Sequence, residues 1–205
     1  TGTSAVSASG DVLIQTQEVT GGGVTDADVD AALTLNAGLT SGGSISLNSA
    51  DGVVLNHADA DITTTAVGNT IDILAGAGVS MVDGALIQTA LGNVRVEALG
   101  GSIELSEIHA GGQGVNAGSV ALIATGAVLD LGTDSSVMDI TAKNLLITSG
   151  TAIAISANRI ETRVATLSAK SSAGGTYIEE ADALIVGSVS VSVDRVDSTG
   201  ATAAT

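Results

Sequence analysis

The sequence predicts an all-β fold, a single-stranded parallel β-helix (a solenoid) of about seven turns with three short strands in each turn. Aliphatic residues come in pairs two positions apart, the period at which an extended strand returns its side chains to the same face. Successive pairs are mostly seven to nine residues apart, and every third pair recurs after 22 to 26 residues. The leading members of this series are Ile45, Ile71, Val94, Val120, Leu145, Leu167 and Val189. A three-strand unit that repeats at about two dozen residues is typical of a solenoid.

The composition agrees with a narrow core built from stacked aliphatic side chains. The 205-residue chain has no Pro, Cys, Phe or Trp and a single Tyr, Tyr177. Without Pro, every strand amide can donate to a neighbouring turn. Without large aromatic rings, the core must consist of Val, Ile, Leu, Ala and Gly. Helix is expected at most as one short turn within residues 26–35, because no stretch carries an apolar stripe at helical spacing.

The charge balance excludes several kinds of partner. Lys and Arg together number 6 against 22 Asp and Glu, which gives a net charge of −16. This field repels nucleic acid and anionic lipid surfaces, and it attracts cations. No apolar run approaches the 18 or so residues that a membrane-spanning helix requires. We therefore expect no nucleic-acid partner, no membrane span and no cofactor, with Ca²⁺ as the one ion to consider.

We expect residues 1–205 to form one β-helix domain with three irregular corners. The step from Val12 to Ile45 is 33 residues, so roughly nine residues exceed the repeat and are assigned to a loop insertion around 20–32. Glycine-rich stretches predict longer corners around 109–118 and 171–175. Both ends are of low complexity, and we interpret the chain as a piece of a larger protein or as a processed subunit.

Three aspartates in the predicted insertion form the candidate metal site. Asp26, Asp28 and Asp30 alternate along the chain, as carboxylates do in loops that bind hard cations. The EF-hand pattern fails, because Ala31 and Ala37 stand where that loop requires Gly and Glu. Two interpretations stay open at this point, a Ca²⁺ site and a solvated acidic loop.

Stacking of the turns also predicts pairs of carboxylates on the outer face. Neighbouring turns lie about 4.8 Å apart, so residues one repeat apart become neighbours. This places Glu104 above Asp130 and Asp139 above Glu161. Paired carboxylates can bind a cation, or they can serve as the acid and base of a glycosidase or lyase.

Other features favour a protein without catalytic activity. Enzymes that act on acidic sugars from a β-helix face also use basic residues to hold the substrate. Here Arg95 is expected directly above Asp72, where a cross-turn ion pair is its simpler role. His57 and His109 are isolated and have no companions for a zinc site, so we expect them at surface corners.

Several segments share a pattern of Gly, a small residue and alternating aliphatic residues. They are GlySerIleSerLeuAsnSer (43–49), GlyAsnValArgValGluAla (92–98), GlySerIleGluLeuSer (101–106) and GlySerValAlaLeuIleAla (118–124). Over roughly residues 40–195 the chain resembles the repeats of filamentous-haemagglutinin-type exoproteins and related giant bacterial surface adhesins. The resemblance implies a right-handed β-helix within a long, exported, surface-associated fibre. The asparagine-rich stacks, secretion domain and signal peptide of such proteins are not seen in this sequence.

Assembly with other chains is the expected mode of action. The ends of a solenoid expose unpaired strand edges and an uncapped core, which recruit another chain. Head-to-tail contacts of this kind produce an open filament, unless the solenoid simply continues in a longer chain. The outward positions expected for Leu146, Ile178 and Ile185 offer a surface for lateral contacts.

The sequence thus predicts a structural or adhesive segment of an extracellular bacterial fibre or giant surface protein, secreted or held at the cell surface. Its expected partners are copies of itself, with cell-surface glycans or other cells as further candidates. Two alternatives stay open. One is a carbohydrate-active β-helix enzyme, a lyase or glycosidase acting on acidic polysaccharide, and the other is a calcium-responsive surface module.

Overall fold

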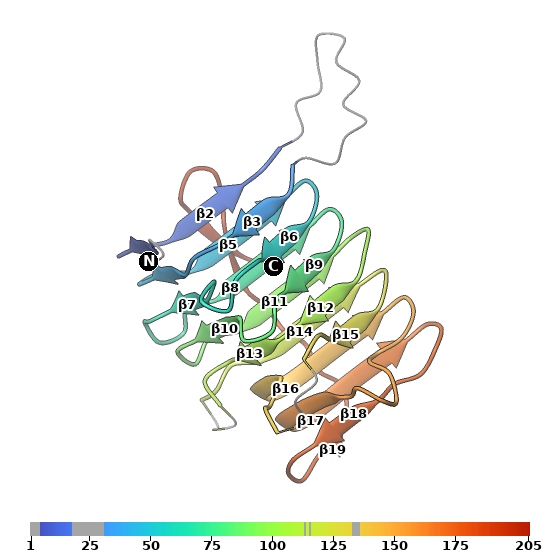
Figure 1. Cartoon of the computed structure of the whole chain (residues 1–205). Coiled ribbons are helices and arrows are strands. Elements are labelled where there is room, and N and C mark those ends of the chain that lie inside the picture. The colour runs from blue at the N-terminus through green and yellow to red at the C-terminus, as the bar shows by residue number, and fades with distance from the viewer. Residues whose placement is uncertain (1–4, 18–30, 113, 115, 133–135) are drawn as a thin grey trace, which may run out of the picture.

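The computed structural model, described for residues 5–17, 31–112, 114, 116–132 and 136–205, is a parallel β-solenoid of about five turns. The described residues contain strands, turns and bends but no helix, so none of them provides a helix long and apolar enough to cross a membrane. The strands stack along one axis, with the N-terminal strands at one end and β18 and β19 at the other (Figure 1).

Each strand in the regular part pairs in parallel with the strand three places further along the chain. One ladder contains β2 (Val12–Gln15), β5 (Ile45–Ser49), β8 (Ile71–Ala75), β11 (Val94–Ala98) and β14 (Val120–Ala124). A second contains β3 (Leu33–Leu35), β6 (Val53–Leu55), β9 (Val79–Met81), β12 (Ile103–Leu105) and β15 (Val128–Asp130). A third contains β1 (Val6–Ala8), β4 (Leu39–Ser41), β7 (Ile62–Thr64), β10 (Leu86–Thr89) and β13 (Glu107–His109).

Two long strands join the first and third ladders near the C-terminal end. The first half of β16 (Ile140–Ser149) pairs with β13 and its second half pairs with β14. The next strand, β17 (Ile160–Ser171), lies along the whole of β16. Two short strands, β18 (Ile178–Glu180) and β19 (Ile185–Val186), then pair with β17 at the end of the stack.

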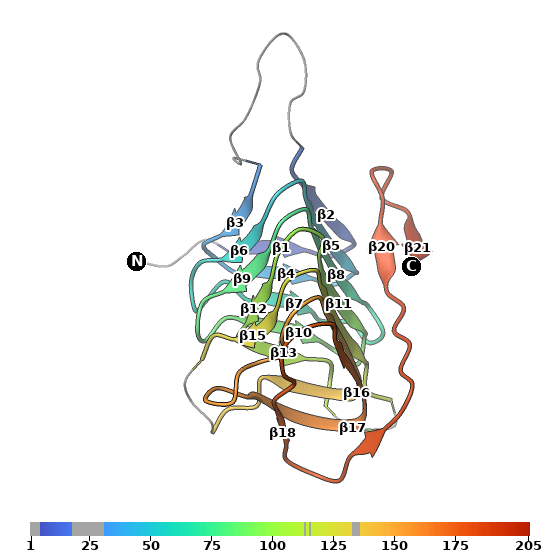
Figure 2. The same cartoon turned by 90° about the vertical axis from the view of Figure 1, so that its right-hand side faces the viewer.

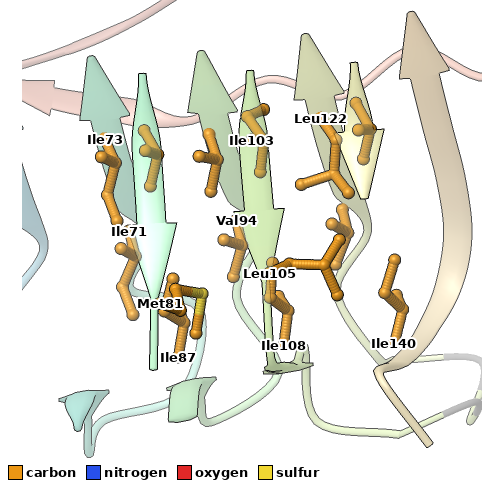
Figure 3. Close-up of a cluster of buried hydrophobic side chains, with 14 of the residues drawn as sticks. Ile71, Ile73, Met81, Ile87, Val94, Ile103, Leu105, Ile108, Leu122 and Ile140 are labelled. Carbon is orange, nitrogen blue, oxygen red and sulfur yellow. The ribbon is translucent and has the colours of Figure 1, made fainter. Parts of the chain in front are cut away.

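The aliphatic column predicted from the sequence is confirmed over most of its length. The paired residues run Ile45, Ile71, Val94, Val120, Leu145 and Leu167. Side chains from all three ladders point into one continuous interior (Figure 3). Since successive inward positions are almost all Val, Ile, Leu, Met or Ala, the hydrophobic effect stabilises each turn against the next.

Glycine is required where corners of successive turns approach closely. A Cβ atom on Gly92 would lie 1.8 Å from the carbonyl oxygen of Asn69, and one on Gly118 would lie 1.8 Å from that of Gly92. No side chain fits at such distances, so these corner glycines follow from the stacking itself.

The prediction of about seven turns is wrong, because the chain leaves the stack after β19. Val186, and not Val189, lies next to Leu167. Residues 187–205, here called the C-terminal strap, run back along the outer side of the solenoid and end in a hairpin (Figure 2). Its antiparallel strands are β20 (Asp194–Val196) and β21 (Thr202–Ala204), and β20 packs against β5 and β8.

The predicted irregular corners are only partly within the described residues. Residues 18–30, which make up most of the expected insertion, lie outside them, as do positions 113 and 115 of the second corner. In the third corner, Gly174 has a φ of 87° between the end of β17 and the start of β18.

Candidate functional site

Three carboxylates from successive parts of the chain meet near the end of the solenoid. Asp130 ends β15, Asp139 directly precedes β16, and Glu161 is the second residue of β17. Carboxylate oxygens of all three lie within 4.8 Å of one another. Asp139 is 4 % exposed and Glu161 is 7 % exposed, while Asp130 is half-buried. We call these three residues the carboxylate cluster.

The stacking of β16 on β17 explains how two members of the carboxylate cluster meet. Ile140 pairs with Thr162, which sets the preceding residues Asp139 and Glu161 side by side, as the sequence predicted. The backbone N–H of Glu161 donates a hydrogen bond of 2.8 Å to Oδ2 of Asp139.

The corner after β15 brings in the third member. The side-chain amide of Asn158 donates to the carbonyl oxygens of Asp130, at 3.1 Å, and Gly132, at 2.7 Å. The backbone N–H of Gly132 donates to Oδ1 of Asp130 at 2.8 Å. These bonds fix the corner against the segment that precedes β17.

Burial controls the charge of the carboxylate cluster. Loss of solvation, assisted by the negative charges of Asp130 and Glu161, raises the pKa of Asp139 to about 8, although the N–H of Glu161 opposes this shift. Like charges at this separation cannot all be ionised without a counter-charge. The arrangement can therefore hold a proton between carboxyl groups, or offer oxygen ligands to a hard cation such as Ca²⁺.

The predicted pair of Glu104 and Asp130 does not form. Glu104 lies next to Leu129, and Asp130 lies next to Leu105. Val128, and not Leu129, occupies the inward position of β15, and a shift of one residue reverses the faces of a strand. Glu104 instead accepts a hydrogen bond of 3.1 Å from Ser80, so the first carboxylate pair proposed for catalysis is absent.

A second charged group lies beneath the C-terminal strap. Asp72 on β8 is 1 % exposed and accepts from Arg95 Nε at 2.9 Å and Arg95 Nη2 at 3.2 Å. This cross-turn ion pair confirms the sequence prediction. The sequence did not predict the second partner, Arg195 of β20, whose Nε donates to Asp72 at 2.6 Å.

The strap is held to the solenoid by further hydrogen bonds. The N–H of Asp194 donates to Thr70 Oγ1 at 2.9 Å, and the N–H of Val196 donates to Ser46 Oγ at 2.8 Å. Val193 and Val196 are buried although they lie on the outside of the solenoid. The strap therefore covers the outward residues Ser46 and Asp72.

The residues predicted for assembly lie in three different settings. Leu146 faces outward on β16 and is half-buried. Ile178 packs against the core beside Ile160, so its predicted outward orientation is wrong, because β18 continues the inward column. Ile185 is 66 % exposed on the last strand of the stack.

The proposed Ca²⁺ site in the insertion is not among the described residues, and the two histidines are not part of the carboxylate cluster. Asp26, Asp28 and Asp30 fall outside the described residues. His57 lies 3.5 Å from Asp59, and His109 lies 3.5 Å from Glu107. Within the described ranges, the one group of three potential metal ligands is the carboxylate cluster, which contains neither histidine.

Comparison of the chain with protein-family models, with curated proteins and with solved structures finds no match. The fold and the site together define a parallel β-solenoid with a buried carboxylate cluster and a C-terminal strap.

Proposed function

We propose that this chain is a non-enzymatic structural segment of an extracellular bacterial fibre or giant surface protein, built as a right-handed β-helix with three strands in each turn. The single observation that carries the proposal is the uninterrupted column of buried aliphatic residues from Ile45 to Leu167. Backbone ladders that run along one axis resist bending and stretching, so such a segment serves as a stiff spacer.

The ends of the solenoid support copies of the same chain as partners. At the N-terminal end, Val6 is 54 % exposed beside a pocket of about 250 Å³ whose walls include Ile14 and Leu33. At the other end, Ile185 and Val186 are 66 % and 79 % exposed. Because all the stacked ladders are parallel, strands in the last turn of one copy can pair in parallel with strands in the first turn of the next copy.

Lateral contacts through Leu146, and contacts with cell-surface glycans or other cells, belong to the same proposal. The alternative of an enzyme acting on acidic polysaccharide has lost one of its two predicted carboxylate pairs, Glu104 with Asp130. The other pair, Asp139 with Glu161, is buried.

Electron microscopy of the purified chain over a concentration series tests the fibre proposal. We expect straight rods whose lengths are multiples of one unit. An Ile185→Asp and Val186→Asp double variant should shorten them to single units, while Val67→Asp, at an exposed corner, serves as the control. Single particles at every concentration would contradict the proposal, and cleavage of an acidic polysaccharide would favour the enzyme instead.

The carboxylate cluster favours a second candidate function, a response to divalent cations. Cation binding to the folded state alone would raise the melting temperature as the ion concentration rises. We expect Ca²⁺ to raise the melting temperature at pH 8, chelation to reverse the effect, and Asp139→Asn to abolish it. An equal response of the variant would place the ion elsewhere, for example at Asp26, Asp28 and Asp30.

A further inference from the structure

A pocket of about 290 Å³ lies between the hairpin of the C-terminal strap and the outer face of β2 and β5. Arg195 and Asp197 of the strap form one wall, and Gln15 and Asn48 are among the residues of the opposite wall. The pocket exists only because the strap folds back onto the first turns of the solenoid. It is separate from the carboxylate cluster, which lies at the other end of the stack.

The ionic groups around this pocket are already engaged within the protein. Both carboxylate oxygens of Asp72 accept from the guanidinium groups of Arg95 and Arg195. Oδ1 of Asp197 accepts from the N–H and hydroxyl of Thr199 and from the N–H of Ala201. These bonds lower the pKa of Asp197 and keep it ionised, so the pocket carries no net positive charge that would attract an anion.

Neutral hydrogen-bonding groups remain available in the pocket. The exposed side-chain amides of Gln15 and Asn48 make no hydrogen bond within the described part of the chain, and each offers both donors and an acceptor. Nη2 of Arg195 is buried and has no hydrogen-bond partner among the residues that the structure describes. Because that atom is covered, a ligand in the pocket does not reach it, and the side-chain amides of Gln15 and Asn48 are the groups that a ligand would contact.

We propose that this pocket binds one neutral sugar unit of a glycan. A sugar ring presents several hydroxyl groups that can donate and accept at once, which matches side-chain amides. The volume lies at the lower end of the range for ligand pockets, about 300 Å³, which limits the ligand to a small molecule. The net charge of −16 disfavours acidic sugars. Because no aromatic ring lines the pocket, we expect weak binding, with a Kd in the millimolar range.

This inference rests on the proposed function, in which glycans are among the partners, and it names the site and the class of sugar. Saturation-transfer NMR on the full chain tests it, with glucose, galactose, mannose and N-acetylglucosamine as neutral probes and glucuronic acid as the charged one. We expect transfer to at least one neutral sugar. The Gln15→Ala and Asn48→Ala double variant should weaken that binding about tenfold or more, which corresponds to about 1.4 kcal/mol.

Gln88→Ala is the matched control, because Gln88 is an exposed amide on β10, in a different ladder. It should leave sugar binding unchanged, and both variants should keep the melting temperature of the parent. Absence of transfer from every neutral sugar, a preference for glucuronic acid, or an equal loss in Gln88→Ala would overturn the proposal. Fibres without sugar binding would refute this inference alone, whereas sugar binding by a chain that forms no rods would refute the fibre proposal alone.

Discussion

Asp72 and Asp139 are both buried aspartates on the outer side of the solenoid, but their surroundings carry opposite charge. Asp72 lies between the guanidinium groups of Arg95 and Arg195. Asp139 lies against two further carboxylates, Asp130 and Glu161. The first aspartate is neutralised by the chain itself, whereas the second requires a proton or a cation from solution. The same residue type therefore stabilises one region and makes the other sensitive to the medium.

Removing the carboxylate of Asp72 should have the largest effect on stability. Asp72→Ala leaves Arg95 and Arg195 without their counter-charge in a mostly buried setting, a change that typically costs about 3–5 kcal/mol. Urea unfolding at pH 7 measures the loss. Asp139→Asn is the matched comparison and should leave stability unchanged or raise it. A similar loss in both variants would remove the proposed contrast.

The pH dependence of stability should come from Asp139. The pKa of Asp139 is about 8 in the folded protein, whereas an aspartate in the unfolded chain has the ordinary value of 3.8. The folded state therefore binds the proton more tightly. The free energy of unfolding should therefore fall as pH rises between these two values, by at most about 1.4 kcal/mol per pH unit from this one group. Below that window both states are protonated, and above it both are ionised, so its contribution is constant there.

Unfolding measured from pH 5 to pH 9 checks this slope, with Asp139→Asn as the variant that should flatten it. Glu161→Gln should also lower the pKa of Asp139, because it removes one negative neighbour. An unchanged slope in Asp139→Asn would assign the pH dependence to other groups.

Arg195→Ala should release the C-terminal strap while leaving the solenoid folded. The variant loses the bond to Asp72, but Arg95 still neutralises that carboxylate, so we expect a loss of about 1–2 kcal/mol. Hydrogen exchange at the amides of Asp194 and Val196 should become faster, because those amides bond to Thr70 and Ser46 only while the strap is docked. Equal acceleration at the amides of β11 would show that the strap and the solenoid unfold together.

The smallest effect is expected at a surface pair. Arg159 and Glu179 are 2.7 Å apart, but both side chains are more than half exposed. Arg159→Ala should therefore change the free energy of unfolding by less than about 0.5 kcal/mol in the same urea assay. A loss of unfolding free energy as large as that of Asp72→Ala would show that burial does not determine how much an ion pair contributes to stability.

Much of the fold could be predicted because the spacing of aliphatic residues along the sequence sets the length of each turn. Residues such as Ile71 and Val94 share an inward position since each lies one turn from the other, and the pair of Arg95 with Asp72 follows from the same count. The pairing of Glu104 with Asp130 was predicted wrongly because Val128, Leu129 and Leu131 are all aliphatic, so more than one inward register of β15 was possible. Counting from the corner would have resolved it, because Ile103 and Val128 each follow their aligned corner glycines, Gly101 and Gly126, by two residues.

The strap and the carboxylate cluster depend on contacts that no repeat encodes. Ser and Val alternate from Ser188 to Val193. This alternation is compatible both with a strand in a further turn of the solenoid and with an extended segment on its outer side. The available signal was the lack of glycine between Gly187 and Gly200, where another turn would need corners. In the carboxylate cluster, the position of Asp130 beside Asp139 and Glu161 depends on the corner after β15, which the spacing of aliphatic residues does not predict.

The central claim, that residues about two dozen positions apart lie side by side on successive turns, can be tested directly because the chain contains no cysteine. Thr63 on β7 and Gln88 on β10 are aligned neighbours, and the usual inter-strand spacing of about 4.8 Å suits a disulfide. Thr63→Cys combined with Gln88→Cys should form an intramolecular disulfide under mild oxidation, detected by mass spectrometry. Thr63→Cys combined with Thr141→Cys, three turns apart in the same ladder, should not. Failure of the first pair to cross-link, or equal cross-linking of both, would contradict the stacked solenoid.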